Sequence, residues 1–462
     1  MPQQKGSFML EVILFFISSI TPVMLSEKDI VTQLTKHFIS LAIIKFDGIT
    51  PYIKLKTHWQ KIGRKDLNII IRNVISPDDR AKVRSSHIIE VIKRITDDLS
   101  LKINISNAFW KQQYLLNFNN GILNIRTREF IEDRSNYIFD YVIDAEYIPN
   151  CRLESAPYFT RFIATSAGKE NLECILRSTG YAISSLTCAK KAFFVTGTSD
   201  GGKSTYLRFL ASAVSPELIS NVSFSQMSDS HYVIQYLGKR MNVSYDNSPK
   251  PMDHEDVFKS VTSCEEIMGR ELYESPVRFI PTLKLIYASN FPFNFKHPDE
   301  ALYKRMIIIP FEYSISPEKQ DKQLFNKLMY ERNIIFSLAA NSLRDLINSG
   351  YDFKMSDKGK AYLASRITML HSVEDFLTDR AFCDENGSVA AAILYNNYTE
   401  WCSCNALSAV DKSEFKERVL GFTASIDYKK VGPREKRVWG FKGIRLKTTE
   451  EFNAPDKING VR

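Results

Sequence analysis

The stretch FFVTGTSDGGKSTYLRFL, residues 193–210, decides the fold of this chain. It begins with residues suited to a short buried strand, passes through a glycine-rich turn and continues into a helical pattern. The turn matches G-x-x-x-x-G-K-[ST], in which backbone N–H groups surround phosphate oxygens. The sequence therefore predicts a phosphate-binding loop between a strand and a helix. The residues expected to form it are Gly197, Thr198, Ser199, Asp200, Gly201, Gly202, Lys203, Ser204 and Thr205.

The residue types in this loop suit ATP and Mg²⁺ as cofactors. Glycines let the backbone approach the phosphates, and the helix adds the positive end of its dipole. Lys203 is expected to reach the β- and γ-phosphates, and the Ser204 hydroxyl to hold Mg²⁺. A glycine-rich strand–helix turn without a ligand is the alternative.

Residues 190–312 alternate strand and helix patterns, as a parallel sheet requires. The expected strands span residues 193–196, 240–244, 283–289 and 306–310. Ligands of such sheets bind at the carboxyl ends of the strands. There we expect Asp246 to serve Mg²⁺ and water, and Asn290 to orient the attacking water. Arg305, before the fourth strand, is expected to complete a neighbouring subunit's site in a ring. Each residue has a structural alternative: an Asp-Asn turn for Asp246, an Asn before a turn for Asn290, and an arginine that flanks a strand for Arg305.

Composition is that of an ordinary globular protein of 462 residues with net charge +8 and pI near 8.9, which favours a polyanionic partner. The seven cysteines are scattered without zinc-site spacing, which predicts reduced thiols in a cytoplasmic protein. The apolar residues 8–25 resemble a signal peptide, but Glu11 and Pro22 interrupt them. We expect a buried helix there and no membrane association.

The rest of the chain divides by pattern. Residues 26–110 are expected to be mainly helical, and short strands follow in residues 114–147 around Asn120-Gly121. Helices are expected in residues 157–185 and 318–348. Residues 372–447 are expected to form a small domain with helices at 373–380, 389–403 and 412–421 and two strands around Gly432-Pro433.

Several short motifs occur in an order that resembles the superfamily 3 helicases of the phage, plasmid and poxvirus primase-helicase group. The resemblance covers about residues 59–446. Its landmarks are Phe118-Asn119-Asn120-Gly121-Ile122-Leu123, Gly180-Tyr181, residues 197–205, Gly238-Lys239-Arg240, Arg270-Glu271-Leu272-Tyr273, Asn290-Phe291-Pro292, and Arg305 leading to Ile309-Pro310-Phe311.

This resemblance implies an α/β fold: an AAA+ type ATPase core with a mainly helical N-terminal region and a C-terminal winged-helix domain. It also implies a ring, usually a hexamer, around single-stranded DNA, with ATP between subunits. By position, Lys203 and Ser204 match the family's Walker A residues, Asp246 its Walker B acid, Asn290 its sensor and Arg305 its arginine finger. The family often has two adjacent Walker B acids, whereas here Tyr245 precedes Asp246.

Two segments are candidates for DNA contact. Residues 267–280 occupy the place of the family's pore hairpin, where Arg270, Arg278 and Lys284 are expected to meet phosphates and Tyr273 to stack on a base. An ordinary hairpin with solvated charges is the alternative. Residues 372–447 resemble the family's winged helix, and their basic end suits origin duplex DNA. The residues expected there are Lys429, Lys430, Arg434, Lys436 and Arg437.

The sequence thus predicts a helical region (1–58), a primase-helicase type N-terminal domain (59–189), an ATPase core (190–350), a linker (351–371), a winged-helix domain (372–447) and a tail (448–462). The predicted function is ATP-dependent DNA unwinding for a virus or mobile element, with a separate primase or polymerase because no acidic cluster precedes residue 59. A remodelling ATPase and a DNA-binding initiator with little turnover are the alternatives; a small-molecule kinase fits less well.

Overall fold

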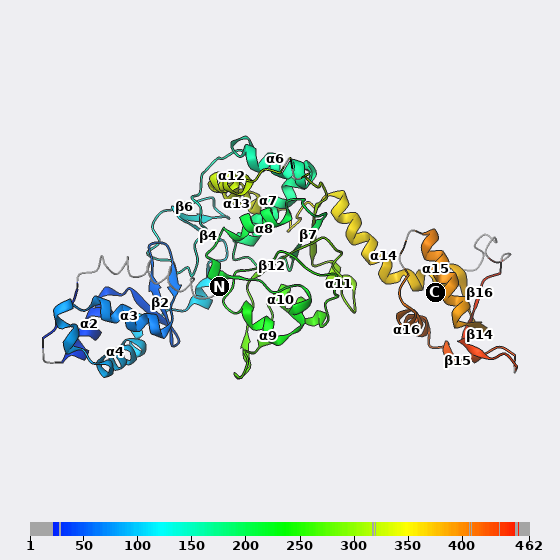
Figure 1. Cartoon of the computed structure of the whole chain (residues 1–462), viewed down its shortest axis with the longest axis horizontal. Helices are drawn as coiled ribbons and strands as arrows, with labels where there is room; N and C mark the ends of the chain where they lie inside the picture. The colour runs from blue at the N-terminus through cyan, green and yellow to red at the C-terminus, as the bar shows by residue number, and fades with distance from the viewer. Residues whose placement is uncertain are drawn as a thin grey trace. The chain divides into compact units, whose positions relative to one another are not determined.

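The computed structural model describes residues 22–26, 29–316, 318, 320–405, 407, 409–433, 435–448 and 451. Most of the apolar stretch 8–25 and most of the tail 448–462 therefore lie outside the described residues. The chain forms two compact units. The first runs to Phe293 and includes Ile309–Met355, and the second combines Asn294–Ile308 with Ser356–Arg462 (Figure 1).

The N-terminal part of the first unit combines helices with a small antiparallel sheet. The helices are α2 (Ile30–Leu41), α3 (Arg64–Val74), α4 (Ser85–Asp97) and α5 (Ile105–Lys111). The strands are β1 (Ile44–Asp47), β2 (Thr50–Lys54) and β3 (Trp59–Lys61). Ile44, Phe46 and Ile53 alternate along two strands and enter the core that the helices cover.

The β1–β3 sheet corrects the sequence-based expectation for this region. The expected boundary between residues 58 and 59 falls between β2 and β3, whose residues pair as Lys54 with Trp59. The strands were missed because they have at most five residues each, so their alternation is hard to distinguish from the surrounding helical pattern.

The next segment follows the prediction. The strands β4 (Leu115–Phe118), β5 (Gly121–Asn124) and β6 (Phe130–Ile131) form an antiparallel sheet, with a two-residue turn between β4 and β5. The helices α6 (Pro157–Ser166) and α7 (Leu172–Ile183) come after it. Gly180 lies where α7 crosses a later helix: a Cβ there would come 2.2 Å from the backbone oxygen of Ala339, so only glycine permits this contact.

A five-stranded sheet forms the centre of the first unit, in the order β13-β7-β12-β9-β8. The strands are β7 (Ala192–Gly197), β8 (Ile219–Ser220), β9 (Met241–Ser244), β12 (Lys284–Ser289) and β13 (Met306–Phe311). β12 pairs in parallel with β7 and β9, and β9 with β8. The four predicted strands are confirmed to within one residue at either end; β8, with two residues, was not predicted.

Helices cover this sheet and connect its strands. α8 (Lys203–Ala211) packs on β7, β9 and β12, and α7 packs along α13. The remaining elements of the unit are α9 (Ser230–Val233), α10 (Glu255–Ser263), the hairpin strands β10 (Ile267–Gly269) and β11 (Val277–Phe279), α12 (Leu324–Tyr330) and α13 (Arg332–Asn348). Over residues 318–348 the sequence predicts one long helix or a pair of helices, and the structure has the pair.

The second unit has its own core around a three-stranded antiparallel sheet of order β14-β16-β15. Its elements are α11 (Glu300–Tyr303), α14 (Asp357–Arg380), β14 (Ala381–Ala390), α15 (Ala391–Cys404), α16 (Lys412–Phe422), β15 (Asp427–Val431) and β16 (Val438–Leu446). Two expectations need correction. The boundary expected at residue 372 lies inside the continuous helix α14, and strand β14 was not predicted.

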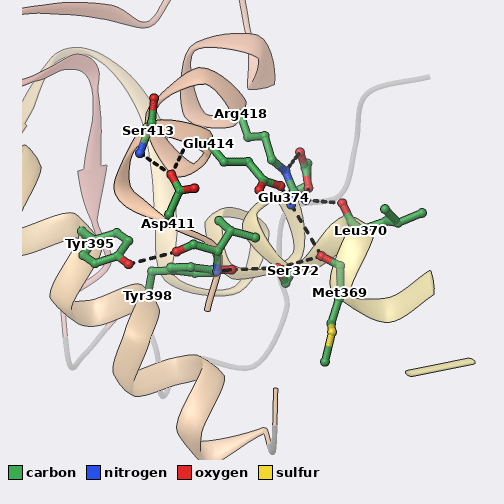
Figure 2. A network of polar contacts seen from close by, with 11 residues as sticks. Met369, Leu370, Ser372, Glu374, Tyr395, Tyr398, Asp411, Ser413, Glu414 and Arg418 are labelled. Atoms are coloured by element: carbon green, nitrogen blue, oxygen red, sulfur yellow. Dashed lines mark hydrogen bonds and ion pairs between the residues drawn. The ribbon is translucent and has the colours of Figure 1, made fainter. Parts of the chain in front are cut away.

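A polar network holds α14, α15 and α16 together (Figure 2). The guanidinium of Arg418, on α16, pairs with Glu374 and donates to the carbonyl oxygen of Leu370, both on α14. The hydroxyls of Ser372 and Tyr398 lie 2.8 Å apart and join α14 to α15. The contacts of Arg418 are partly buried and the Ser372–Tyr398 contact is buried, and together they fix the three helices as one packed group.

All seven cysteines lie in the described ranges and are free thiols. Within those ranges, no helix combines the length and the apolar character that crossing a bilayer would require.

Candidate nucleotide site and nucleic-acid surfaces

The phosphate loop connects β7 to α8, as predicted. Gly197 has φ 145° and a Cβ there would lie 1.9 Å from the carbonyl oxygen of Phe311 on the neighbouring strand β13. Gly202, directly before α8, has φ 87°. Asp200 also adopts the left-handed region, with φ 59°. The loop therefore needs glycine at two of its positions for steric reasons, and it leads into the N-terminus of a nine-residue helix.

Lys203 is the first residue of α8 and is buried. Its Nζ donates hydrogen bonds to the carbonyl oxygens of Thr198 and, at 3.1 Å, Gly197. Burial lowers the pKa of this amine, and the nearby carboxylates of Asp200 and Asp246 oppose the shift. The cation is thus held over the loop, opposite two acids.

The carboxyl ends of β7, β9 and β12 meet at this loop. Asp246 follows β9, Asn290 follows β12, and both side chains are exposed. The Nδ2 of Asn290 donates to the Ser199 hydroxyl at 3.3 Å. Lys203, Ser204, Asp246 and Asn290 all line one cavity of about 410 Å³, which we call the phosphate-loop cavity.

Asn247, which the sequence did not single out, holds this edge together. It is 1% exposed. Its Oδ1 accepts from the backbone N–H of Phe224 at 2.7 Å, and its Nδ2 donates to the carbonyl oxygen of Ala288 at 2.8 Å. The Ser289 hydroxyl donates to the Asn247 carbonyl at 2.9 Å. The ends of β9 and β12 are therefore tied directly beneath Asp246 and Asn290. An Asn three residues after the end of a buried strand is the signal that could have identified it.

Tyr245, directly before Asp246, also lines the cavity. Burial raises the pKa of its hydroxyl, an effect that the nearby Arg208 partly offsets. The phenol therefore stays protonated at neutral pH and cannot act as a carboxylate ligand.

Residues beyond the predicted motifs close the cavity. Phe162 comes from α6, and four residues come from the segment after β13. These four are Ile315, Gln320, Asp321 and Leu324. Asp321 pairs with Lys327 at 2.6 Å. The segment follows a strand of the same sheet, so its position at the carboxyl edge could have been inferred from the strand pattern.

Arg305 is half-buried, directly before β13, and its backbone N–H donates to the Leu302 carbonyl at 3.0 Å. It is not among the described residues that line the phosphate-loop cavity. The first unit therefore brings together Lys203, Ser204, Asp246 and Asn290, whereas Arg305 belongs to the second unit.

The hairpin expected in residues 267–280 is present: β10 and β11 pair in antiparallel register, Met268 opposite Arg278. Residues 270–278, between and along the strands, are exposed. Tyr273 is fully exposed, with φ 66°. Arg278 lies 3.6 Å from Glu266, and Arg270 lies 3.4 Å from His231. Arg270, Tyr273 and Arg278 are thus all on an exposed surface, as DNA contact would require.

The predicted DNA contact of Lys284 is wrong. Lys284 lies in the central strand β12 and is 3% exposed. Its Nζ donates to the Ser184 carbonyl at 3.4 Å and lies 5.1 Å from the ring centre of Tyr181. Burial lowers its pKa to about 7, and nearby Arg240 adds to the shift. A side chain enclosed in this way does not reach a phosphate backbone.

The basic residues of the second unit lie on β15, β16 and the loop between them, which we call the wing (residues 427–446). Lys429, Lys430, Lys436 and Arg437 are exposed; Arg434 lies outside the described residues. Trp439 is 56% exposed and stacks on Tyr428 across the strand pair, with ring centres 5.3 Å apart. The wing therefore presents cations next to an exposed aromatic face.

Comparisons with known proteins agree with parts of this picture. Residues 35–166 match a family model described as D5 N terminal like, and residues 195–305 match a family of unknown function, DUF5906. No curated protein matches this sequence.

Among solved structures, the A form apo structure of the NrS-1 C-terminal region covers 89% of this chain and 99% of its own, with 12% identity and a TM-score of 0.50. Another apo structure of the NrS-1 C-terminal region covers 90% of this chain and 99% of its own, with 12% identity and a TM-score of 0.49. The chain is therefore similar to the D5 N-terminal-like family over residues 35–166, and in fold to the NrS-1 C-terminal region.

Proposed function

We propose that this chain is an ATP-dependent DNA helicase for the replication of a virus or mobile element. The observation that carries the proposal is the phosphate-loop cavity, in which Lys203, Ser204, Asp246 and Asn290 converge from three strand ends. The four residues have the chemical types that phosphoryl transfer from ATP requires: a cation, a hydroxyl, an acid and an amide.

The residues fit ATP and Mg²⁺. The steric demand for glycine at Gly197 and Gly202 allows the loop backbone and the start of α8 to face phosphate oxygens. Lys203 would bind the β- and γ-phosphates. The Ser204 hydroxyl and the Asp246 carboxylate would hold Mg²⁺, which uses few protein ligands besides phosphate and water. The metal would neutralise charge that develops on the phosphates.

The two remaining residues, Asn290 and Arg305, would act within a ring of subunits. Asn290 would orient the attacking water, since its amide already contacts Ser199 of the loop. Arg305, directly before β13, would serve as the arginine finger of a neighbouring subunit in a homohexamer. In this reading, residues 190–350 are an AAA+ type core.

DNA would contact two surfaces. The 267–280 hairpin offers Arg270, Tyr273 and Arg278 to single-stranded DNA in the ring's pore. Residues 357–446 follow the order helix, strand, helix, helix, strand, strand, which supports a winged-helix domain whose wing contacts origin duplex DNA. The match of residues 35–166 to the D5 N-terminal-like family supports a role in replication.

ATP hydrolysis by the full chain, measured with and without single-stranded DNA, tests the proposal. We expect DNA to stimulate hydrolysis, and Lys203→Ala to lower turnover about 10²-fold or more, because one aligned charge on the transferred phosphate is lost. Unwinding of a forked duplex should follow the same pattern. Turnover that ignores both DNA and the Lys203→Ala change would refute the helicase assignment.

Tyr245 supports a second candidate, a DNA-binding replication initiator or remodelling ATPase of the same fold. Because Tyr245 is a protonated phenol and not a second acid, the end of β9 offers hydrolysis one carboxylate, that of Asp246. A Tyr245→Asp variant separates the candidates. If turnover rises from near zero only in the variant, the natural chain is an initiator; if the natural chain already hydrolyses ATP and unwinds DNA, it is a helicase.

A further inference from the structure

A second cavity, of about 480 Å³, lies in the first unit away from the phosphate loop. Its walls are the turn between β5 and β6, the loop of residues 147–150 and the middle of α13. We call it the α13 cavity. The residues that matter for its chemistry are Arg128, Phe130, Tyr147, Asn150, Asn341 and Arg344.

Local hydrogen bonds preform these walls. The Asn124 side chain accepts from the backbone N–H groups of Arg126, at 3.0 Å, and Thr127, at 3.3 Å, and so shapes the turn that carries Arg128. The Tyr147 hydroxyl donates to Asn341 at 3.3 Å, and the backbone N–H of Ile148 donates to Ser337 at 2.9 Å. The loop is therefore fastened to α13, and the cavity does not depend on a ligand to form it.

The cavity is lined by more cationic than anionic side chains. Arg128 and Arg344 line it with a single acid, Asp345. Among the described residues, the Nη1 of Arg344 is buried and has no hydrogen-bond partner. An unpaired guanidinium N–H is costly to bury, and planar guanidinium groups bind phosphate oxygens well. The arrangement favours an anionic ligand.

The rest of the lining suits a ligand with a flat ring. The rings of Phe130 and Tyr147 are stacked with centres 5.6 Å apart, and the side-chain amides of Asn150 and Asn341 offer donors and acceptors. Burial raises the pKa of Tyr147, so its hydroxyl stays protonated at neutral pH and keeps its hydrogen bond to Asn341. The volume falls in the range of about 300–1,000 Å³ that is common for small-molecule sites.

We propose that the α13 cavity binds a nucleotide, with its phosphate at Arg128 and Arg344 and its base beside Phe130 and Tyr147. The nucleotide is either a free nucleoside phosphate or the terminal nucleotide of a DNA strand, since both present the same groups. The proposal goes beyond the helicase assignment and does not depend on it, because no residue of this cavity lines the phosphate-loop cavity.

The experiment uses the full chain carrying Lys203→Ala, which weakens binding at the phosphate loop. Calorimetry measures binding of dTTP and of a 5′-phosphorylated decathymidylate. Arg128→Ala, added to this background, is expected to weaken binding of the preferred probe about tenfold or more, because a charge-assisted hydrogen bond is lost. Arg126→Ala is the matched control: it lies on the same exposed turn but stacks on Tyr114, outside the cavity.

The two probes identify the source of the nucleotide. Arg128-dependent binding of dTTP supports a free nucleoside phosphate, and Arg128-dependent binding of the decathymidylate alone supports a strand end. The proposal fails if neither probe binds, or if Arg128→Ala and Arg126→Ala change binding equally. Arg344→Ala should match Arg128→Ala; because Arg344 is half-buried, its thermal unfolding is measured first, and Arg128→Ala decides the outcome if that variant does not fold.

Discussion

The carboxyl edge of the five-stranded sheet and the 267–280 hairpin carry the two halves of the proposed activity, and they are built in opposite ways. At the sheet edge, Gly197 lies against the backbone of β13 and Asn247 is buried with hydrogen bonds to two neighbouring segments. At the hairpin, Tyr273 is fully exposed and Arg278 has one surface ion pair at 3.6 Å.

The difference shows how chemistry and contact place different demands on a fold. A site for phosphoryl transfer needs its groups held in fixed positions, so buried backbone and amide contacts surround it. A surface that meets DNA needs accessible cations and rings, and it contributes little to stability. Substitutions of the buried residues at the sheet edge should therefore change folding, whereas substitutions at the hairpin should change only binding.

The largest effect is expected for Gly197→Ala. The new Cβ would clash with the Phe311 carbonyl oxygen at a φ of 145°, so we expect unfolding to become easier by about 4 kcal/mol. Gly238→Ala is the control, since Gly238 has φ 71° but nothing within 4 Å of its Cβ position, and should cost about 1 kcal/mol. Chemical denaturation of both variants measures the difference; equal losses would contradict the tight packing of the loop.

Asn247→Ala should destabilise the chain by about 3 kcal/mol, because the Phe224 N–H and the Ala288 carbonyl lose their partner inside the protein. Asn290→Ala sharpens the comparison at the same edge. Asn290 is exposed and makes one bond to Ser199, so its loss should leave stability within about 0.5 kcal/mol. ATP turnover should nevertheless fall about 10²-fold. Denaturation and ATPase assays on both variants decide; a stable Asn247→Ala protein would show that the network is dispensable.

Lys284 lies in the buried interior of the same sheet, where it should make stability depend on pH. Its pKa is lowered from 10.5 to about 7 in the folded chain, so the unfolded chain binds more protons between those values. The free energy of unfolding should therefore rise with pH from about 7 towards 10.5, by at most about 1.4 kcal/mol per pH unit. Lys284→Met should lack this rise and be more stable than the natural chain at pH 6. Parallel pH profiles for the two proteins would argue against a neutral buried amine.

The smallest effect on folding is expected at the hairpin. Tyr273→Ala should leave thermal unfolding unchanged, because the side chain is fully exposed. Binding of a fluorescent oligothymidylate should weaken about tenfold, the loss expected when a base no longer stacks on a ring. Leu272→Ala, at the neighbouring exposed position, removes apolar surface without a ring and serves as the control. Unchanged DNA affinity in Tyr273→Ala would remove Tyr273 from the contact surface.

Local sequence patterns were sufficient to predict much of this fold. The phosphate loop, the four longer strands of the central sheet and the hairpin were predicted from residue type and spacing, because each depends on neighbours in sequence. The short strands β1–β3 and β8 were missed, although the similarly short β4, β5 and β9 were predicted. The boundary at residue 372 was wrong because α14 continues through a change in composition.

The sequence by itself determined which groups lie at the strand ends: Lys203 and Ser204 after β7, Asp246 after β9 and Asn290 after β12. Only the tertiary structure decided which side chains are enclosed. It buried Lys284 in the sheet, tied two strand ends through Asn247 and closed the phosphate-loop cavity with residues from α6 and from the segment after β13. The physical reason is that the position of each strand along the chain follows from local periodicity, whereas burial depends on segments distant in sequence that pack around a residue.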